Sequence, residues 1–337
     1  MSGTNRCIVL DARPTQGVSE ALFRLEDVPR GEPADGELLI RVVYLSLDPA
    51  MRGWIADAPN YREPVPLGAV MPGFTVGEVV VSHHDGYAPG DIVLGRQGWQ
   101  EWAISDGSDI DRKIAPGVAP LTASLHILGM TGLTGYLGLT EVGRPREGET
   151  VVVSTAAGAV GSVVGQVAKI LGCRAVGIAG GEEKRRACLD EFGFDAAIDY
   201  RGSGDLSAAV AEAAPEGVDV FFDNTGGPIA DAVMDHINIG ARIVVCGTIG
   251  IEGHETGPRP NRQLLINRAR MEGFLVLDHF DRLEESVRRL GIWLREGRLA
   301  YREDITDGLE QAPVALVRML AGENRGKTIV RVGPEPA

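Results

Sequence analysis

Cysteine is scarce in this sequence, and its four residues lie too far apart along the chain to form a recognised pair. They are Cys7, Cys173, Cys188 and Cys246. No two have the C-x-x-C spacing of a zinc or redox site, and no cluster of His, Cys, Asp and Glu has zinc-ligand spacing, so we expect no metal. Four cysteines in 337 residues are also too few for a disulfide scaffold. This favours reduced thiols in a cytoplasmic protein.

Positive charge is in deficit as well. The chain has 33 lysines and arginines against 47 aspartates and glutamates, which gives a formal net charge of −14. Such a balance disfavours nucleic acid and anionic membrane as partners. Long apolar runs are also missing, because the uncharged stretches Ile114–Thr140 and Thr150–Ala168 are broken by glycines. A spanning helix needs about 20 mostly apolar residues, so we expect no membrane partner.

The order of elements indicates a small β-rich domain interrupted by an α/β domain. Strand-like runs, such as Glu37–Leu47, Thr75–Val81 and Tyr87–Leu94, fill the first third of the chain and are separated by prolines and glycines. From about residue 121, strands alternate with helices, a pattern typical of a parallel sheet covered on both faces. Tyr301–Leu320 is predicted as loop plus helix, and Lys327–Val332 as a final strand that returns to the first domain.

The α/β part contains a predictable series of elements. The predicted strands are Thr150–Ala156, Arg174–Gly180, Ala196–Tyr200, Val218–Asn224, Ala241–Gly247 and Glu272–Leu277. The predicted helices are Val160–Leu171, Glu182–Phe192, Asp205–Ala214, Pro228–Ile237 and Phe280–Glu296. Their apolar residues recur at helical or strand spacing.

The motif with the clearest chemistry is Ala156-Ala157-Gly158-Ala159-Val160-Gly161, between the first predicted strand and helix of this series. It is the dinucleotide fingerprint with alanine in place of the first glycine. Gly158 would let the backbone approach a pyrophosphate, Gly161 would let helix and strand pack closely, and the helix N-terminus would favour the phosphates. The alternative is a tight turn that needs small residues. The chain has no G-x-S-x-G elbow and no Walker lysine.

The end of the second strand of the series favours NADP over NAD. An NAD enzyme usually has an acid there, which accepts a hydrogen bond from the ribose 2′-hydroxyl. Here the strand ends in Gly180-Gly181, and Lys184 follows on the next helix. Small residues leave room for a 2′-phosphate that lysine can neutralise. The alternative is that Lys184 is a solvated surface residue, since Glu182 and Glu183 beside it oppose a phosphate.

Two later strand ends are further candidates for cofactor contacts. Asn224 follows one strand and could bind ribose or an amide, or it could simply cap the next helix. The Gly-rich loop Cys246–Gly250 follows the next strand and suits close backbone contact with nicotinamide, or it is a flexible connection.

Motifs along nearly the whole chain carry a family resemblance. They are LSLDPAMRGW (Leu45–Trp54), GMTGLTGYLGL (Gly129–Leu139), STAAGAVGSVVGQVAKILGC (Ser154–Cys173), GIAGGEEK (Gly177–Lys184), FFDNTGG (Phe221–Gly227), RMEGFLV (Arg270–Val276) and the tail Tyr301–Val330. The chain resembles the zinc-free alkenal and enone reductases of the medium-chain dehydrogenase/reductase superfamily, the prostaglandin reductase and curcumin reductase group. Zinc alcohol dehydrogenases need cysteines that are missing between Cys7 and Cys173.

The resemblance implies a GroES-like catalytic domain of residues 1–125 and 298–337 and an inserted Rossmann domain, residues 126–297, with NADP(H) in the cleft between them. Gly158–Gly161 would hold the pyrophosphate, and Lys184 with Tyr200 the 2′-phosphate. The residues implied to contact the cofactor are Met130, Thr134, Gly158, Ala159, Val160, Gly161, Lys184, Tyr200, Asn224, Cys246, Gly247, Thr248, Ile249, Gly250, Phe274, Leu275, Val276 and Asn324.

The sequence departs from the family pattern at two positions. Thr131 stands where many relatives have proline, and Ile266 stands where some have an active-site tyrosine. Tyr61 is our candidate for the missing hydroxyl in the substrate pocket, with an exposed loop aromatic as the alternative.

The implied activity is hydride transfer from NADPH to the β-carbon of an enal or enone, without metal, in a homodimer. Two alternatives stay open: a zinc-free NADPH:quinone oxidoreductase, and a non-catalytic NADPH-binding sensor.

Overall fold

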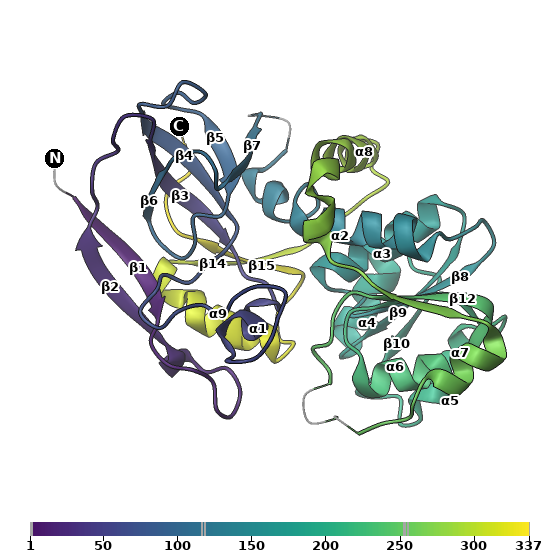
Figure 1. Ribbon diagram of the computed structural model, residues 1–337. Helices are drawn as coiled ribbons and strands as arrows, with labels where there is room; N and C mark the ends of the chain where they lie inside the picture. The colour runs from purple at the N-terminus through teal and green to yellow at the C-terminus, as the bar shows by residue number, and fades with distance from the viewer. Residues whose placement is uncertain (1–2, 116, 118, 252–253, 255, 337) are drawn as a thin grey trace. The chain divides into compact units, whose positions relative to one another are not determined.

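The chain folds into two compact units, of which the second is an insertion in the first. The computed structural model describes residues 3–115, 117, 119–251, 254 and 256–336. One unit comprises Met1–Leu125 and Glu303–Ala337, and the other His126–Arg302. The predicted class, a β-rich unit interrupted by a parallel α/β unit, is confirmed (Figure 1). Among the described residues, every helix is too short or too polar to cross a membrane.

The first unit is built on a mixed sheet in the order β14-β15-β3-β4-β5-β7, with β6 also paired to β3. Its strands are β3 (Leu38–Ser46), β4 (Thr75–Ser82), β5 (Ile92–Gly95), β6 (Trp102–Ser105), β7 (Ile110–Ile114), β14 (Glu303–Asp307) and β15 (Lys327–Arg331). A separate antiparallel pair, β1 (Thr4–Leu10) and β2 (Phe23–Pro29), carries the N-terminus.

The main core of this unit lies around its two α-helices, α1 (Met51–Ile55) and α9 (Ala312–Leu320). Leu10 of β1, Met51 of α1 and Leu316 of α9 are all fully buried in one cluster. Apolar side chains from the two ends of the chain thus leave water together, which stabilises the unit and fixes α1 in place.

At this core, a buried lysine joins the two chain segments that make up the first unit. Lys327 at the start of β15 is only 2% exposed. Its Nζ donates to the Leu47 carbonyl at 2.5 Å, to Asp48 Oδ1 at 3.0 Å and to the Thr328 carbonyl at 3.3 Å. All three ammonium donors therefore have acceptors, which is the condition under which a buried charge is tolerated.

The second unit contains a parallel sheet in the order β10-β9-β8-β11-β12-β13. Its strands are β8 (Thr150–Ser154), β9 (Arg174–Ala179), β10 (Ala196–Asp199), β11 (Val218–Asp223), β12 (Ile237–Val245) and β13 (Arg270–Gly273). Its α-helices are α2 (Met130–Leu137), α3 (Ala159–Ile170), α4 (Glu182–Asp190), α5 (Leu206–Ala213), α6 (Gly227–Met234), α7 (Asn261–Asn267) and α8 (Leu283–Arg295).

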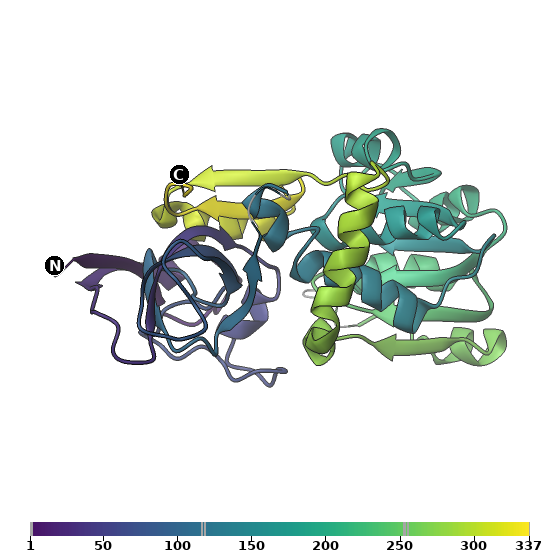
Figure 2. The same cartoon turned by 90° about the horizontal axis from the view of Figure 1, so that it is seen from above.

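Helices cover both faces of this parallel sheet. Figure 1 shows α2 and α3 on one face and α5, α6 and α7 on the other. Figure 2 shows the long helix α8 next to α2, where Tyr136 and Trp293 meet edge to face at 5.8 Å. The strand order reverses between β8 and β11. Ligands of doubly wound sheets bind at the carboxyl ends of the strands at such a reversal.

Three predicted segments differ in the structure, and helix α7 forms where no element was predicted. Residues 303–307 were expected to be loop but form β14, an acidic edge strand that pairs only with β15. The last strand of the parallel sheet is Arg270–Gly273, two residues earlier than predicted, and all four residues are exposed. β12 begins at Ile237, within the predicted helix. Edge strands with charged or exposed residues lack the apolar pattern on which a strand prediction depends.

We expect Lys327→Met to lower the free energy of unfolding by about 3–5 kcal/mol, because it leaves the Asp48 carboxylate without its buried cation. Urea unfolding followed by tryptophan fluorescence measures this change. The matched control is Lys113→Met, which removes a half-exposed lysine from an ion pair with Asp91 of 2.6 Å and should cost less than about 1 kcal/mol. Equal losses in the two variants would contradict the role given to Lys327.

Candidate functional site

The turn between β8 and α3 is shaped by glycine and by one strained residue. A Cβ on Gly161 would lie 2.8 Å from the Ala156 Cα and would also collide with the Thr155 carbonyl oxygen. Helix and strand can therefore approach this closely only with glycine at position 161. Thr155 has a φ of +54°, a costly backbone conformation for a β-branched residue. Its carbonyl accepts a hydrogen bond from the Gly158 N–H at 2.9 Å.

A buried histidine contacts the start of α3 from the side. His126 is 1% exposed, and its Nε2–H donates to the Ala159 carbonyl at 3.3 Å. Its ring meets Tyr301 edge to face at 5.5 Å. The His126 carbonyl in turn accepts from the Thr131 hydroxyl at 3.1 Å. The threonine that departs from the family pattern is thus tied to the segment that supports the fingerprint turn.

A buried network joins the carboxyl ends of β8 and β11. Ser154 Oγ donates to Asp223 Oδ1 at 3.0 Å, and the same oxygen accepts from the backbone N–H groups of Thr225 and Gly226, each at 2.9 Å. Burial raises the pKa of Asp223, and these donors lower it in part. A carboxylate with this many donors is an effective anchor for two strand ends.

Asn224 takes part in the same network. Its backbone N–H donates to Ser154 Oγ and its Nδ2 donates to the Ser154 carbonyl, both at 2.7 Å. The Asn224 amide nitrogen therefore helps to hold the ends of β8 and β11 together. The expected contact of Asn224 with cofactor ribose stays a prediction.

The Gly-rich loop after β12 lies directly against the loop after β11. The N–H groups of Cys246 and Gly247 donate to the Asp223 carbonyl at 2.8 and 3.1 Å, and the Gly250 N–H donates to the Thr225 carbonyl at 2.7 Å. A Cβ on Gly247 would lie 2.5 Å from the Asn224 carbonyl oxygen. Three backbone hydrogen bonds thus join this loop to the segment after β11. Burial raises the pKa of Cys246 to about 12, so its thiol is neutral.

Glycine also makes room for an aromatic ring at the end of β9. A Cβ on Gly180 would lie 2.9 Å from the ring and the hydroxyl oxygen of Tyr200. Tyr200 itself is 40% exposed, and the Arg201 guanidinium lies 5.8 Å from its ring centroid. Asp199 Oδ1 accepts from the backbone N–H groups of Gly181 and Arg201. The segment after β10 is therefore fixed beside the segment after β9.

The two glutamates that oppose a phosphate near Lys184 are both paired with cations. Glu182 accepts from Arg185 at 2.6 Å and from Arg186 at 2.7 Å, and these hydrogen bonds lower its pKa to about 2. Glu183 pairs with Arg302 at 3.1 Å. Because each negative charge is compensated locally, the glutamates repel an anion near α4 less than the sequence suggests.

The remaining predicted cofactor residues lie in both units. Met130 begins α2, and its carbonyl accepts from the Thr134 hydroxyl at 2.7 Å. Phe274 follows β13 and is 7% exposed; its ring stacks on His279 at 5.1 Å. The predicted residues that lie in the second unit are Met130, Thr134, Gly158 to Gly161, Lys184, Tyr200, Asn224, Cys246 to Gly250 and Phe274 to Val276. Asn324 belongs to the first unit, where its Nδ2 donates to the Gly326 carbonyl at 2.7 Å.

Tyr61, the predicted substrate-pocket residue, lies in the first unit next to α1. Its hydroxyl oxygen accepts from Trp54 Nε1–H at 2.7 Å. Burial raises the pKa of Tyr61, while the Trp54 hydrogen bond and the Arg62 charge lower it and the Asp48 charge raises it. The residue as a whole is 48% exposed, and its hydroxyl has the buried Trp54 indole as a hydrogen-bond partner.

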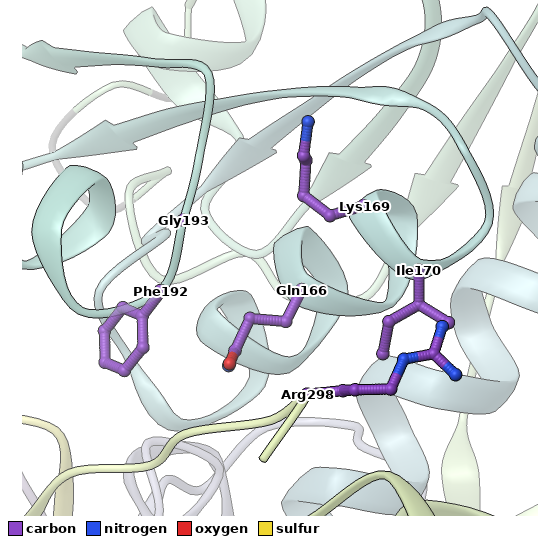
Figure 3. Close-up of a pocket in the computed structure, with 6 residues that line it drawn as sticks. All are labelled: Gln166, Lys169, Ile170, Phe192, Gly193 and Arg298. Atoms are coloured by element: carbon purple, nitrogen blue, oxygen red, sulfur yellow. The ribbon is translucent and has the colours of Figure 1, made fainter. Parts of the chain in front are cut away.

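A cavity of about 320 Å³ in the second unit is not the nucleotide site. It is lined by Gln166, Lys169, Ile170, Phe192, Gly193 and Arg298 (Figure 3). Lys169 and Ile170 are at the C-terminal end of α3, the end opposite the fingerprint turn. The Lys169 amine points away from Gln166 and Arg298 and pairs with Asp195 at 2.7 Å. Polar groups that converge on one point are the usual sign of a ligand site, and this cavity lacks them.

Metal-ligating side chains do not gather in the part of the chain that the structure describes. There, no group of three or more His, Cys, Asp or Glu residues could hold a metal ion.

Sequence models of known families match both units. The model described as "N-terminal domain of oxidoreductase" matches residues 6–112, and the model described as "Zinc-binding dehydrogenase" matches residues 159–291.

Similar proteins match over nearly the full length. The NADPH-dependent curcumin reductase of Escherichia coli K12 is 44% identical over 97% of this chain and 97% of its own. The NADP-dependent 2-alkenal reductase of Nicotiana tabacum is 40% identical over 91% of this chain and 90% of its own. The crystal structure of CurA from Vibrio vulnificus in complex with NADPH is 42% identical, with a TM-score of 0.92, and the match covers 98% of this chain and 100% of that one.

These matches confirm the predicted GroES-like first domain and Rossmann-type second domain. The first family model includes Tyr61, and the second begins at Ala159, within the fingerprint turn. The chain belongs to the medium-chain dehydrogenase/reductase family.

Proposed function

We propose that this enzyme reduces the C=C bond of α,β-unsaturated aldehydes and ketones with NADPH. The observation that carries the proposal is the fingerprint turn at the strand reversal, in a chain that matches NADPH-dependent curcumin and alkenal reductases over nearly its full length. Enals and enones are the substrate class. The physiological substrate within that class is set by pocket side chains.

The residues at the carboxyl ends of β8, β9 and β11 fit NADPH. Without a side chain at Gly158, the pyrophosphate can approach the first N–H groups of α3, where the helix dipole is favourable, and Gly161 lets α3 begin close to β8. Lys184 and Tyr200 bind the 2′-phosphate, and the paired state of Glu182 and Glu183 supports this assignment. Asn224 and the Cys246–Gly250 loop line the ribose and nicotinamide.

The other contacts are assigned on the family likeness. Met130 and Thr134 contact the cofactor from α2, and Phe274, Leu275, Val276 and Asn324 contact its nicotinamide half. Because the Phe274 side chain is buried, we assign its contact to the backbone.

The protein's part in the reaction is orientation and charge stabilisation. Bound NADPH supplies a hydride to the substrate β-carbon, which moves the π electrons onto the carbonyl oxygen and gives an enolate. Tyr61 donates a hydrogen bond to that oxygen and stabilises its developing charge. The α-carbon then takes a proton from water or from a side chain, and the enolate becomes the saturated carbonyl compound.

We also propose that the enzyme is a homodimer of the cytoplasm. Family likeness supports the dimer, and the few, widely spaced cysteines suit a reducing compartment. Sedimentation velocity at micromolar concentration gives about twice the chain mass of 35.8 kDa if the dimer forms.

The substrate class is tested by the oxidation of NADPH at 340 nm. We expect 2-alkenals and enones to be reduced and quinones of similar size to be reduced more slowly. Faster turnover of quinones would favour a quinone oxidoreductase. Tight binding of NADPH without turnover of any compound in the panel would indicate a sensor.

Lys184→Ala tests the preference for NADP. We expect the KM for NADPH to rise about tenfold or more, since a charge-assisted contact to the 2′-phosphate is lost, while the KM for NADH stays unchanged. The control is Lys169→Ala, at the end of α3 away from the fingerprint turn, which should leave both KM values unchanged. An unaltered KM for NADPH in Lys184→Ala would remove this residue from the site.

Tyr61→Phe tests the hydroxyl in the substrate pocket. We expect kcat with a 2-alkenal to fall about tenfold or more, because a donor to the developing enolate oxygen is lost, and NADPH affinity to stay the same. Tyr87→Phe, a tyrosine of the same unit that packs against His84, is the control. Wild-type kcat in Tyr61→Phe would show that Tyr61 is an ordinary loop aromatic.

A further inference from the structure

The hydroxyl of the half-exposed Tyr61 is hydrogen-bonded to a buried tryptophan. It accepts a hydrogen bond of 2.7 Å from Nε1–H of Trp54. Trp54 is only 7% exposed and belongs to the core cluster around α1 and α9. A half-exposed tyrosine is thus fixed by a donor that is itself anchored in the core.

The loop that carries Tyr61 is held against α1 at further points. The Val65 N–H donates to the Trp54 carbonyl at 2.8 Å, so the chain returns to the same residue by its backbone. Asn60 Oδ1 accepts from the Tyr61 N–H at 2.8 Å, and the Asn60 amide group occupies the space that a side chain at Gly53 would need. The position of the tyrosine hydroxyl therefore follows from α1 despite its exposure.

The direction of the Trp54 hydrogen bond decides what Tyr61 can do. Indole N–H is a donor only, whereas a phenol can donate and accept. Because Trp54 fills an acceptor position of the Tyr61 oxygen, the Tyr61 O–H proton is directed elsewhere. A hydroxyl in this arrangement is prepared to donate to an oxygen atom of a ligand.

The Arg62 guanidinium lies beside the pair formed by Trp54 and Tyr61. The Arg62 guanidinium is 4.7 Å from the centroid of the Trp54 ring, a cation–π distance. Burial is the largest influence on the Tyr61 hydroxyl and, together with the Asp48 carboxylate, raises its pKa above the ordinary value, while the Trp54 hydrogen bond and the Arg62 charge offset part of that rise. Trp54 and Arg62 thus make the Tyr61 hydroxyl a better hydrogen-bond donor than burial alone would leave it.

We propose that Trp54 and Arg62 are positioning residues that hold the Tyr61 hydroxyl as a donor to the substrate carbonyl oxygen. The inference rests on the proposed function and adds to it the means by which a single exposed hydroxyl is oriented. It assigns no contact with substrate to Trp54.

The test compares wild type, Trp54→Phe, Tyr61→Phe and the double variant with NADPH and a 2-alkenal. Trp54→Phe keeps an aromatic ring and removes the N–H. We expect Trp54→Phe to lower kcat about tenfold, the factor that corresponds to one hydrogen bond to a charged group, with little change in the KM for the alkenal. In the Tyr61→Phe background the same substitution should change kcat less than twofold, because no hydroxyl is left to orient.

Two further variants separate hydrogen bonding from packing. Trp54→His retains a ring N–H, so its kcat should be higher than that of Trp54→Phe. If Trp54 acted only by packing, the more apolar phenylalanine would give the higher kcat. Arg62→Met alters an exposed side chain, and we expect it to leave the fold intact. It should lower kcat severalfold in wild type and leave it unchanged in Tyr61→Phe.

Trp102→Phe is the matched control, since the Arg30 guanidinium lies at the same 4.7 Å from the Trp102 ring in the same unit. We expect wild-type kcat for it, and unchanged dissociation constants for NADPH in all variants as a check on folding. If Trp54→Phe changes the dissociation constant for NADPH, its kcat is not interpreted. The effect of Arg62→Met on kcat in wild type and in Tyr61→Phe then decides whether the inference holds.

Wild-type kcat in Trp54→Phe or in Arg62→Met would overturn the inference, and so would losses that add in the double variant. The proposed function fails separately, if wild-type enzyme reduces no enal or enone, and the inference then fails with it.

Discussion

The hydrogen bond from Ser154 to Asp223 is the contact on which the nucleotide site depends. It joins the last residues of β8 and β11, the two neighbouring strands between which the order of the parallel sheet reverses. The fingerprint turn starts directly after Ser154, and the loops after β11 and β12 both bond to Asp223. Burying a carboxylate is costly unless donors surround it, and here the donors are the backbone of the loops that the site needs.

The hydroxyl of Tyr61 is held in a comparable way, by a hydrogen bond from a side chain of the core. In the second unit, Asp223 organises three loops from within the sheet. In the first unit, Trp54 extends from the core to fix Tyr61 in an exposed loop. In both arrangements a side chain of a regular element fixes polar groups in the loops beside it, and for Tyr61 we propose that this preorganises the hydroxyl for the charge that develops in the reaction.

The fold class and the fingerprint turn could be predicted from the sequence, because the motifs that indicate them are formed by residues close together in the chain. The fingerprint at Gly158–Gly161, the alternation of strands and helices and the family motifs each depend on residues close together in the chain. What the sequence did not reveal depends on distant residues. Ser154 and Asp223 are 69 positions apart, and Lys327 is 279 positions from Asp48. Glu182 and Glu183 look repulsive in sequence, but cations of α4 and Arg302 compensate them. The acidic edge strand β14 forms because β15 provides its partner.

The most direct test of the account is the destination of the hydride. NADPH that carries deuterium at the transferring C4 position is incubated with the enzyme and an enone, and the product is examined by mass spectrometry and NMR. The account predicts a saturated ketone with deuterium on the carbon β to the carbonyl group. Deuterium on the carbonyl carbon of an allylic alcohol would contradict it, as would a saturated ketone without label.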